Sequence, residues 1–445
     1  MSTLETQIGQ WRAAILRGGS VDEADADELE GHLREQISDL EASGLADDEA
    51  FLIAVRRLGQ VDLITAEFAR EHSDRLWKQL ALTHQPDERP RPVLLMLGFA
   101  VLTAVLVQVA RLLAGFPETS SPWFLRDVSL FVLPVLAAYF AISRRMSPSR
   151  SLALAGVVAV VALAVNLFPF PPAASTDLLV AIHLPVLLWF VVGVAYVGGD
   201  VRSSAARMNF IRFTGEWAIY YALIALGGGV LLGLTGLVLS PIAPDAVEEV
   251  FLWVLPSGAA GAVIVAAWLV EAKKSIIENL APVLTAIFTP LFAIMLLVSA
   301  VVYTIGGVGR EFDRDLLIVF DVLLLVVLGL VVYGISARDR SKQAGLADAL
   351  RLVAVGAAII LDLLVLASMF ARIGEFGFTP NRVAALGLNI LLLVNLAVAA
   401  WLIARMLAGR SPAIRLERWQ TGYLPVFAGW VLLVVLALPP LFGFA

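Results

Sequence analysis

The sequence predicts an all-α, polytopic integral membrane protein: a bundle of about eleven transmembrane helices preceded by a small N-terminal helical bundle. Three observations predict this fold class. Hydrophobic residues make up 59% of the 445 residues and charged residues only 16%, well below the roughly 25% of soluble domains. Eleven apolar stretches approach the roughly 20 residues that a helix needs to cross the hydrocarbon layer. The first 90 residues, by contrast, are charged and amphipathic.

Residues 1–85 are predicted to form a head of three or four amphipathic helices. Apolar residues recur at helical spacing, and glycines separate the successive stripes. Because a core this small is marginal alone, we expect part of its apolar surface to dock on a partner or on the membrane domain. The expected docking face comprises Leu29, Leu33, Ile37, Phe51 and Leu58.

The charge of the head is strongly acidic. Residues 1–90 hold 19 of the 38 acidic residues but only 9 of the 32 Lys and Arg residues. A phosphate backbone requires a basic face, so nucleic-acid binding by the head is excluded. The first residues contain no uninterrupted apolar core typical of a signal peptide, so we expect the head to stay in the cytoplasm.

The order of residues in the head resembles a known family. Residues 28–68 read ELEGHLREQISDLEASGLADDEAFLIAVRRLGQVDLITAEF. This segment is similar to the bacterial permease-prefix domain and the HAAS-type domain. The resemblance implies an interaction role in front of a membrane permease, or beside a PadR-like transcription regulator, rather than catalysis.

Residues 86–445 are predicted to form the transmembrane domain. Lys and Arg accumulate on the cytoplasmic side of membrane proteins. With the head inside, the inner loops contain 16 such residues and the outer loops 5, which supports eleven spans in the cell membrane and a C-terminus outside. The expected spans are 92–114, 127–142, 151–168, 178–198, 216–240, 250–270, 282–305, 315–336, 350–371, 382–404 and 423–442.

Two segments of this domain carry further expectations. A glycine-rich face on the fifth span is expected to pack within the chain, with a dimer seam or a hinge as alternatives. The segment SPAIRLERWQTGYLP, residues 411–425, is expected to lie along the lipid surface or to act as a connector. The glycines of the face are Gly227, Gly228, Gly229, Gly233 and Gly236.

The membrane domain also resembles a known family. Residues 376–396, FGFTPNRVAALGLNILLLVNL, and the sequence GEWAIYY before the fifth span are similar to the domain of unknown function 4153 family. That resemblance implies a bacterial polytopic membrane protein and no specific activity.

Polar residues inside the spans are the candidate functional site, because ionisable groups are costly in lipid. Asp362, Asp321, His183, Arg111 and Asn389 all fall in the predicted outer half of the membrane. We expect an outward-facing vestibule in which Asp321 or Asp362 binds a cation or a proton, with Arg111 or His183 as counter-charge. The alternative is structural: Arg111 reaches water at the membrane surface, and the other groups hydrogen-bond across helix contacts.

Enzyme signatures are not found. The sequence has no phosphate-binding G-x-x-x-x-G-K-[ST] loop, no H-E-x-x-H motif and no cysteine, and no cofactor is expected. One hypothesis is permease-like or channel-like transport of an ion or small solute, regulated by the head. The alternative is a membrane sensor whose head docks a cytoplasmic, PadR-like regulator. The expected partners are therefore the lipid bilayer, the transported solute and a regulatory protein.

Overall fold

The chain divides into two compact units, Met1–Pro90 and Arg91–Ala445, in a computed structural model. In the first unit, the structure describes residues 4–5, 7–9, 11–12, 23–42, 46, 50–51 and 54–55. The long helix of this unit is α2 (Glu23–Ala42). In the second unit, the structure describes residues 91–115, 122–240, 244–272, 280–307, 314–336, 338 and 344–445.

The apolar stripe of α2 is buried inside the head. Leu33 is 0% exposed and Ile37 is 3% exposed, and Phe51 packs against the same cluster. These three side chains therefore contribute to the core of the head, and the partner-docking face stays a prediction. The side chain of Leu29 and the whole of Leu58 lie outside the described residues.

An ion pair ties the N-terminal segment of the head to α2. The Arg34 guanidinium donates to both carboxylate oxygens of Glu5, at 2.7 and 2.8 Å. This hydrogen bonding holds the pKa of Glu5 below its ordinary value, because it stabilises the charged carboxylate. The pair is exposed to solvent and therefore contributes little to stability.

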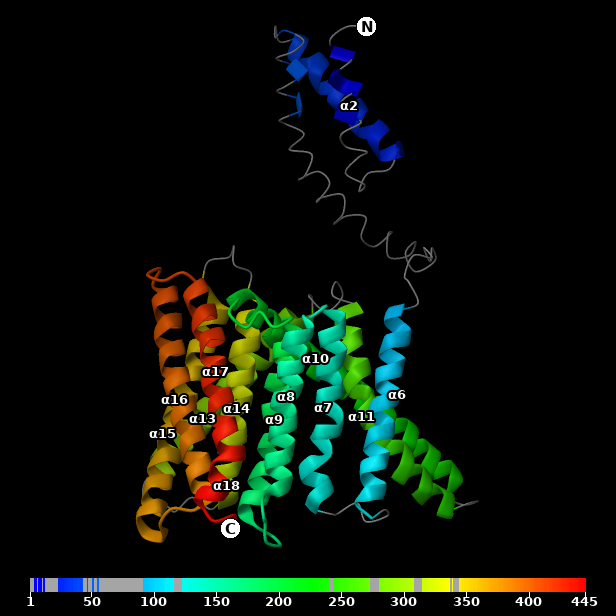
Figure 1. Ribbon diagram of the computed structural model, residues 1–445. Coiled ribbons are helices and arrows are strands. Elements are labelled where there is room, and N and C mark those ends of the chain that lie inside the picture. The colour runs from blue at the N-terminus through cyan, green and yellow to red at the C-terminus, as the bar shows by residue number, and fades with distance from the viewer. Residues whose placement is uncertain are drawn as a thin grey trace. The chain divides into compact units, whose positions relative to one another are not determined.

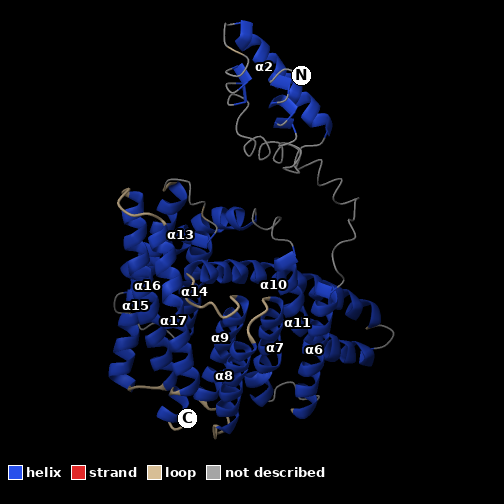
Figure 2. Cartoon of the chain, turned by 45° about the horizontal axis from the view of Figure 1, so that its top comes forward, coloured by secondary structure: helices blue, strands red, loops and turns tan. Residues whose placement is uncertain are grey.

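The second unit is a bundle of long helices that stand side by side, with α6 near one edge and α15 and α16 near the other (Figure 1). All the regular structure of the described residues is helical (Figure 2). The helices are α6 (Arg91–Leu113), α7 (Pro122–Ser143), α8 (Pro148–Leu167), α9 (Ser175–Tyr196), α10 (Ser204–Leu239), α11 (Pro244–Ala272), α13 (Leu280–Gly307), α14 (Arg314–Ser336), α15 (Leu346–Phe376), α16 (Pro380–Leu407), α17 (Ile414–Leu436) and α18 (Leu438–Leu441).

Among the described residues, ten of these helices are long and apolar enough to cross a membrane. The predicted all-α membrane bundle is therefore confirmed. The seventh predicted span falls on α13, in which the apolar part with described side chains is the shorter stretch Thr289–Ile305. We call the end of the bundle where α6 begins the Arg91 end, and the opposite end the Leu113 end.

Two large hydrophobic cores hold the bundle together, and a small third cluster joins α9, α16, α17 and α18. The first joins α6, α7, α8, α9 and α11, and the second joins α13, α14, α15 and α16. Helices α10 and α17 contribute to both cores: Phe213 and Val435 to the first, Met208 and Leu416 to the second. These two helices therefore connect the helices of the first core to those of the second.

Two predicted helix starts are wrong. The fifth span begins at Ser204 rather than at residue 216, because the hydroxyl of Ser203 accepts a hydrogen bond from the N–H of Ala206 and caps an earlier turn. The segment 411–425 is neither a surface strip nor a simple connector. Most of it forms the first turns of α17, where Leu416 and Glu417 are buried.

The glycine-rich face of α10 does not pack within the described part of the chain. An added Cβ at Gly227, Gly228, Gly229 or Gly233 would meet no atom within 4 Å, and only Gly236 lies against another helix, through Phe251. The expectation of packing inside the chain is therefore wrong for four of the five glycines. Small residues permit close packing of helices, but they do not determine which helix is the neighbour.

Gly387 of α16 is a position where glycine is required. A Cβ at this residue would stand 2.0 Å from two ring carbons of Trp430 on α17. We expect Gly387→Ala to lower the free energy of unfolding by about 1–3 kcal/mol, as overpacking does. Thermal unfolding of the purified protein in detergent would measure the loss.

Gly374 of α15 offers a matched control, since an added Cβ there would meet nothing within 4 Å. Gly374→Ala should leave the unfolding midpoint unchanged or raise it slightly, because alanine favours the helix by roughly 0.5–1 kcal/mol. Equal midpoints for Gly387→Ala and the wild type would contradict the close contact with Trp430. Recovery in the double variant Gly387→Ala, Trp430→Leu would support it.

Candidate functional site

Three of the predicted site residues lie on neighbouring helices α14, α15 and α16. The amide Nδ2 of Asn389 donates to Asp321 Oδ1 at 2.8 Å and to the carbonyl oxygen of Ala385 at 2.9 Å. The same amide lies 3.9 Å from the sulfur of Met369 on α15. Asn389 is 0% exposed, so this pairing of Asp321 with an amide is internal to the bundle.

Asp362 is the most isolated charge of this cluster. Its side chain is 0% exposed, and neither carboxylate oxygen has a hydrogen-bond donor among the described residues. The oxygen Oδ1 of Asn389 also lacks a donor there. Buried acceptors without donors are costly, so these oxygens are candidates for binding a donor such as a water molecule or a cation, and the Asp362 carboxylate also for binding a proton.

The order of these groups along α15 gives their relative depth. Met369 marks the level of the Asp321–Asn389 pair, and Asp362 lies seven residues earlier on the same helix. At 1.5 Å per residue, Asp362 is about 10 Å farther from the Leu113 end. Leu361 and Val365, beside it on the helix, are buried in the second hydrophobic core.

A cavity of about 420 Å³ connects Asp321 with the Leu113 end of the bundle. Its walls come from α9, α14, α15 and α16, and its polar lining consists of His183, Asp321, Arg372, Thr379, Asn381 and Arg382. The Nδ1 of His183 lies 2.8 Å from the carbonyl oxygen of Leu179. A carbonyl only accepts, so the proton of a neutral His183 is on Nδ1, and Nε2 is an acceptor.

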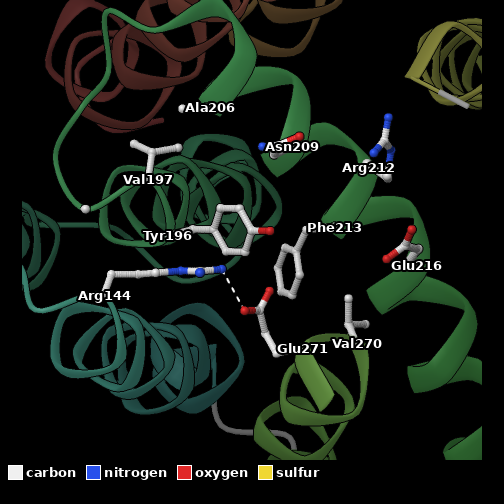
Figure 3. Close-up of a pocket in the computed structure, with 11 residues that line it drawn as sticks. Arg144, Tyr196, Val197, Ala206, Asn209, Arg212, Phe213, Glu216, Val270 and Glu271 are labelled. Atoms are coloured by element: carbon white, nitrogen blue, oxygen red, sulfur yellow. Dashed lines mark hydrogen bonds and ion pairs between the residues drawn. The ribbon is translucent and has the colours of Figure 1, made fainter. Parts of the chain in front are cut away.

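A second polar cavity, also of about 420 Å³, lies at the Arg91 end between α7, α9, α10 and α11 (Figure 3). Arg144, at the end of α7, donates to Glu271 of α11 at 2.7 Å and lies 4.7 Å from the ring centre of Tyr196. Glu216 of α10 lines the same cavity and is buried. Both signs of charge therefore occur here, and the ion pair joins two helices.

No protein-family model, curated protein or solved structure matches the chain. Its function is therefore inferred from the chemistry of its own residues. Among the described residues there is no group of three or more His, Cys, Asp or Glu side chains that could hold a metal ion. A structural or catalytic metal centre thus has no support in that part of the chain.

Arg111 lies apart from the cavity that contains His183 and Asp321. Its guanidinium donates to Gln108 at 2.9 Å and to the carbonyl oxygen of Leu252 on α11. Helix α6 packs on α7 and α11, and Arg111 does not line the cavity between α9, α14, α15 and α16. The structure thus does not bring Arg111 together with His183 and Asp321, and its hydrogen bonds join α6 to α11.

A buried network at the Leu113 end was not predicted. Arg126 of α7 donates to Asp127 at 2.9 Å and to Asp177 of α9 at 3.0 Å. Asn166 of α8 donates to Asp127 at 3.1 Å. The Arg126 guanidinium also lies 5.3 Å from the ring centre of Phe170, within the range of a cation–π contact.

The polar residues that sequence reasoning missed share one property: they fall at the ends of spans. Arg126 and Arg144 entered the prediction only as loop charges, and Glu216 and Glu271 flank apolar runs. The sequence did contain a signal for two of them: Glu216 in GEWAIYY and Glu271 in WLVEAKK are acidic residues at span ends that are otherwise basic, on the predicted cytoplasmic side. An acid kept at such a boundary indicates a buried partner of opposite charge.

Proposed function

We propose that this integral membrane protein is a permease-like or channel-like transporter that moves a small monovalent cation, H⁺ or Na⁺. The observation that carries the proposal is the buried carboxylate of Asp362, which has no donor among the described residues. An ionisable side chain with this environment inside a span is a functional candidate by default.

The chemistry of the cluster favours a cation over an anion. Asp362 offers two acceptor oxygens, and Asp321 and Asn389 lie about two helical turns nearer to the cavity. Acceptor oxygens without donors attract protons and hard cations. The Asp321–Asn389 pair lies between the cavity and Asp362, which supports a stepwise path for such an ion.

The direction of the protein in the membrane is part of the proposal. Arg and Lys residues concentrate in the loops at the Arg91 end, which supports a cytoplasmic location for that end. The acidic head precedes α6 in the chain and would then also be cytoplasmic. Its resemblance to permease-prefix domains supports a role in regulating the transport domain. No described feature of the head favours the signalling alternative over this role.

The test is cation flux in liposomes that contain the purified full-length protein. With a membrane potential imposed, dyes for pH and for Na⁺ would report entry of either ion. We expect Asp362→Asn to abolish the flux and Asp321→Asn to reduce it strongly, because each variant removes a negative charge from the path.

Asp200→Asn is the matched control, since Asp200 is exposed on a loop at the Arg91 end and should transport like the wild type. Wild-type flux in Asp362→Asn would remove Asp362 from the path. Absence of flux of both ions in the wild type would refute the transport of H⁺ or Na⁺ and favour the sensor alternative.

A further inference from the structure

We propose that the cavity between α9, α14, α15 and α16 binds an amphipathic organic monoanion: one carboxylate on a small apolar body. The inference deepens the proposed function, on which it rests, because it assigns a second solute to the path of the cation. It is carried by the distribution of charge and apolar surface along the cavity.

The mouth of the cavity is cationic. Arg372 of α15 and Arg382 of α16 line it, and among the described residues Asp321 is the only acidic one in its lining. Arg382 is held in place by the carbonyl oxygens of Phe376 and Gly377, to which its Nη1 donates at 3.1 and 2.8 Å. Arg372 has no ion pair or hydrogen bond among the described residues, so its guanidinium is available to a ligand. Arginine binds carboxylates through paired, charge-assisted hydrogen bonds.

The first turn of α16 adds to this preference for an anion. Thr379 caps the helix by accepting from the N–H of Arg382, and both Thr379 and Asn381 line the cavity. The partial positive charge of a helix N-terminus attracts negative groups. Two arginines and a helix start therefore converge on the same mouth.

The walls below the mouth are apolar. Leu178 and Ile182 of α9 face the cavity together with Leu317 and Ile318 of α14 and Leu388 of α16. A volume of about 420 Å³ falls within the range of small-molecule sites, which is roughly 300–1,000 Å³. These walls fit an aliphatic or aromatic body, and they offer few partners to a sugar or another strongly polar solute.

The floor of the cavity limits the ligand to one negative group. Asp321 lies at the level of Met369, three residues along α15 from Arg372, which corresponds to about 4.5 Å. Asp362 lies deeper still. A second carboxylate at the inner end of the ligand would face these two acids and be repelled. The two arginines therefore hold the anionic end of the ligand at the mouth. The inner carboxylates of Asp321 and Asp362 stay available to the transported cation.

Direct binding tests this inference without any flux measurement. The full-length protein in lipid nanodiscs would be titrated with radiolabelled benzoate in a scintillation proximity assay. We expect saturable binding that unlabelled 4-methylbenzoate displaces. Acetate, which lacks the apolar body, should compete at least about tenfold more weakly, since burying a few carbon atoms contributes that much. Benzylamine should not compete, and neither should terephthalate, whose second carboxylate would lie at the inner end.

A matched pair of variants locates the site. Arg372→Gln should weaken benzoate binding by about tenfold or more, as expected for the loss of a charge-assisted hydrogen bond. Arg410→Gln, at an exposed arginine near the Arg91 end, should bind like the wild type. Arg372→Lys keeps the charge and should retain more binding than Arg372→Gln, which guards against a simple folding defect.

The outcomes separate this inference from the proposed function. Cation flux that depends on Asp362, together with no benzoate binding, would overturn the anion site and leave the transport proposal standing. Benzoate binding without cation flux would support the anion site and overturn the transport proposal. Equal competition by benzylamine, equal competition by acetate, or unchanged affinity in Arg372→Gln would each overturn the assignment of the mouth as a carboxylate site.

Discussion

Asp362→Asn is expected to be more stable than the wild-type protein while losing cation flux. Asp362 is 0% exposed, and both of its carboxylate oxygens lack donors among the described residues. A buried acceptor without a partner costs about 1–3 kcal/mol, and more when it is charged. Replacement by the neutral, isosteric amide removes the cost of burying a charge, while its own oxygen and amino group still need partners, so the free energy of unfolding should rise by at most about 1–3 kcal/mol.

This expected gain distinguishes a functional role for Asp362 from a structural one. If Asp362 were a structural hydrogen-bonding residue, its replacement would leave partners unsatisfied and would lower stability. If it is kept for ion binding, stability and activity should change in opposite directions, as they do at strained functional sites. Thermal and denaturant unfolding in detergent would measure the first quantity, and liposome flux the second.

The same helix provides the matched control. Asp348 of α15 is also buried, but it accepts from Arg351 at 2.7 Å and lies 3.4 Å from a guanidinium nitrogen of Arg338. Asp348→Asn leaves the buried guanidinium of Arg351 without this counter-charge, so we expect a loss of about 3 kcal/mol. The two aspartate substitutions should therefore have opposite signs. A loss of stability in both variants would contradict the reading of Asp362 as an unsatisfied charge.

The contrast between these two aspartates also shows what the sequence could predict about the site. Hydropathy placed Asp321, Asp362 and Asn389 inside spans, and the antiparallel course of successive helices placed them on one side of the membrane. That much follows from segment length alone. The pairing of Asp321 with Asn389 depends on which helices are neighbours. A helix that is apolar on every face has no amphipathic pattern from which its neighbours could be predicted.

Arg111 illustrates the limit most clearly. It lies in the last turn of α6, and α6 packs on α7 and α11 rather than on the helices of the cavity. Depth is a one-dimensional property of the sequence, whereas the lateral position of a helix is set by side-chain packing between all the spans. The same reason explains why Gly227, Gly228, Gly229 and Gly233 were expected to contact a neighbouring helix and, among the described residues, do not.

Arg126→Gln is expected to cause a large loss of stability, because Arg126 compensates two acidic groups at once. It lies 2.9 Å from an oxygen of Asp127 and 3.0 Å from an oxygen of Asp177, and Asp127 is only 1% exposed. Removing one partner of a buried ion pair costs about 3–5 kcal/mol, since the remaining charge stays buried without compensation. Unfolding in detergent would measure this loss.

Two further variants show whether that loss comes from stranded charge or from lost packing. Arg410→Gln removes an exposed arginine and should change stability by less than about 0.5 kcal/mol. The double variant Arg126→Gln, Asp127→Asn restores neutrality at the more buried acid and should recover part of the loss, because Asn166 can still hydrogen-bond to the new amide. A double variant no more stable than Arg126→Gln would mean that the guanidinium contributes chiefly through its contact with Phe170. Partial recovery would show that charge compensation in this network stabilises the packing of α7, α8 and α9. Helix α9 carries His183, which lines the cavity.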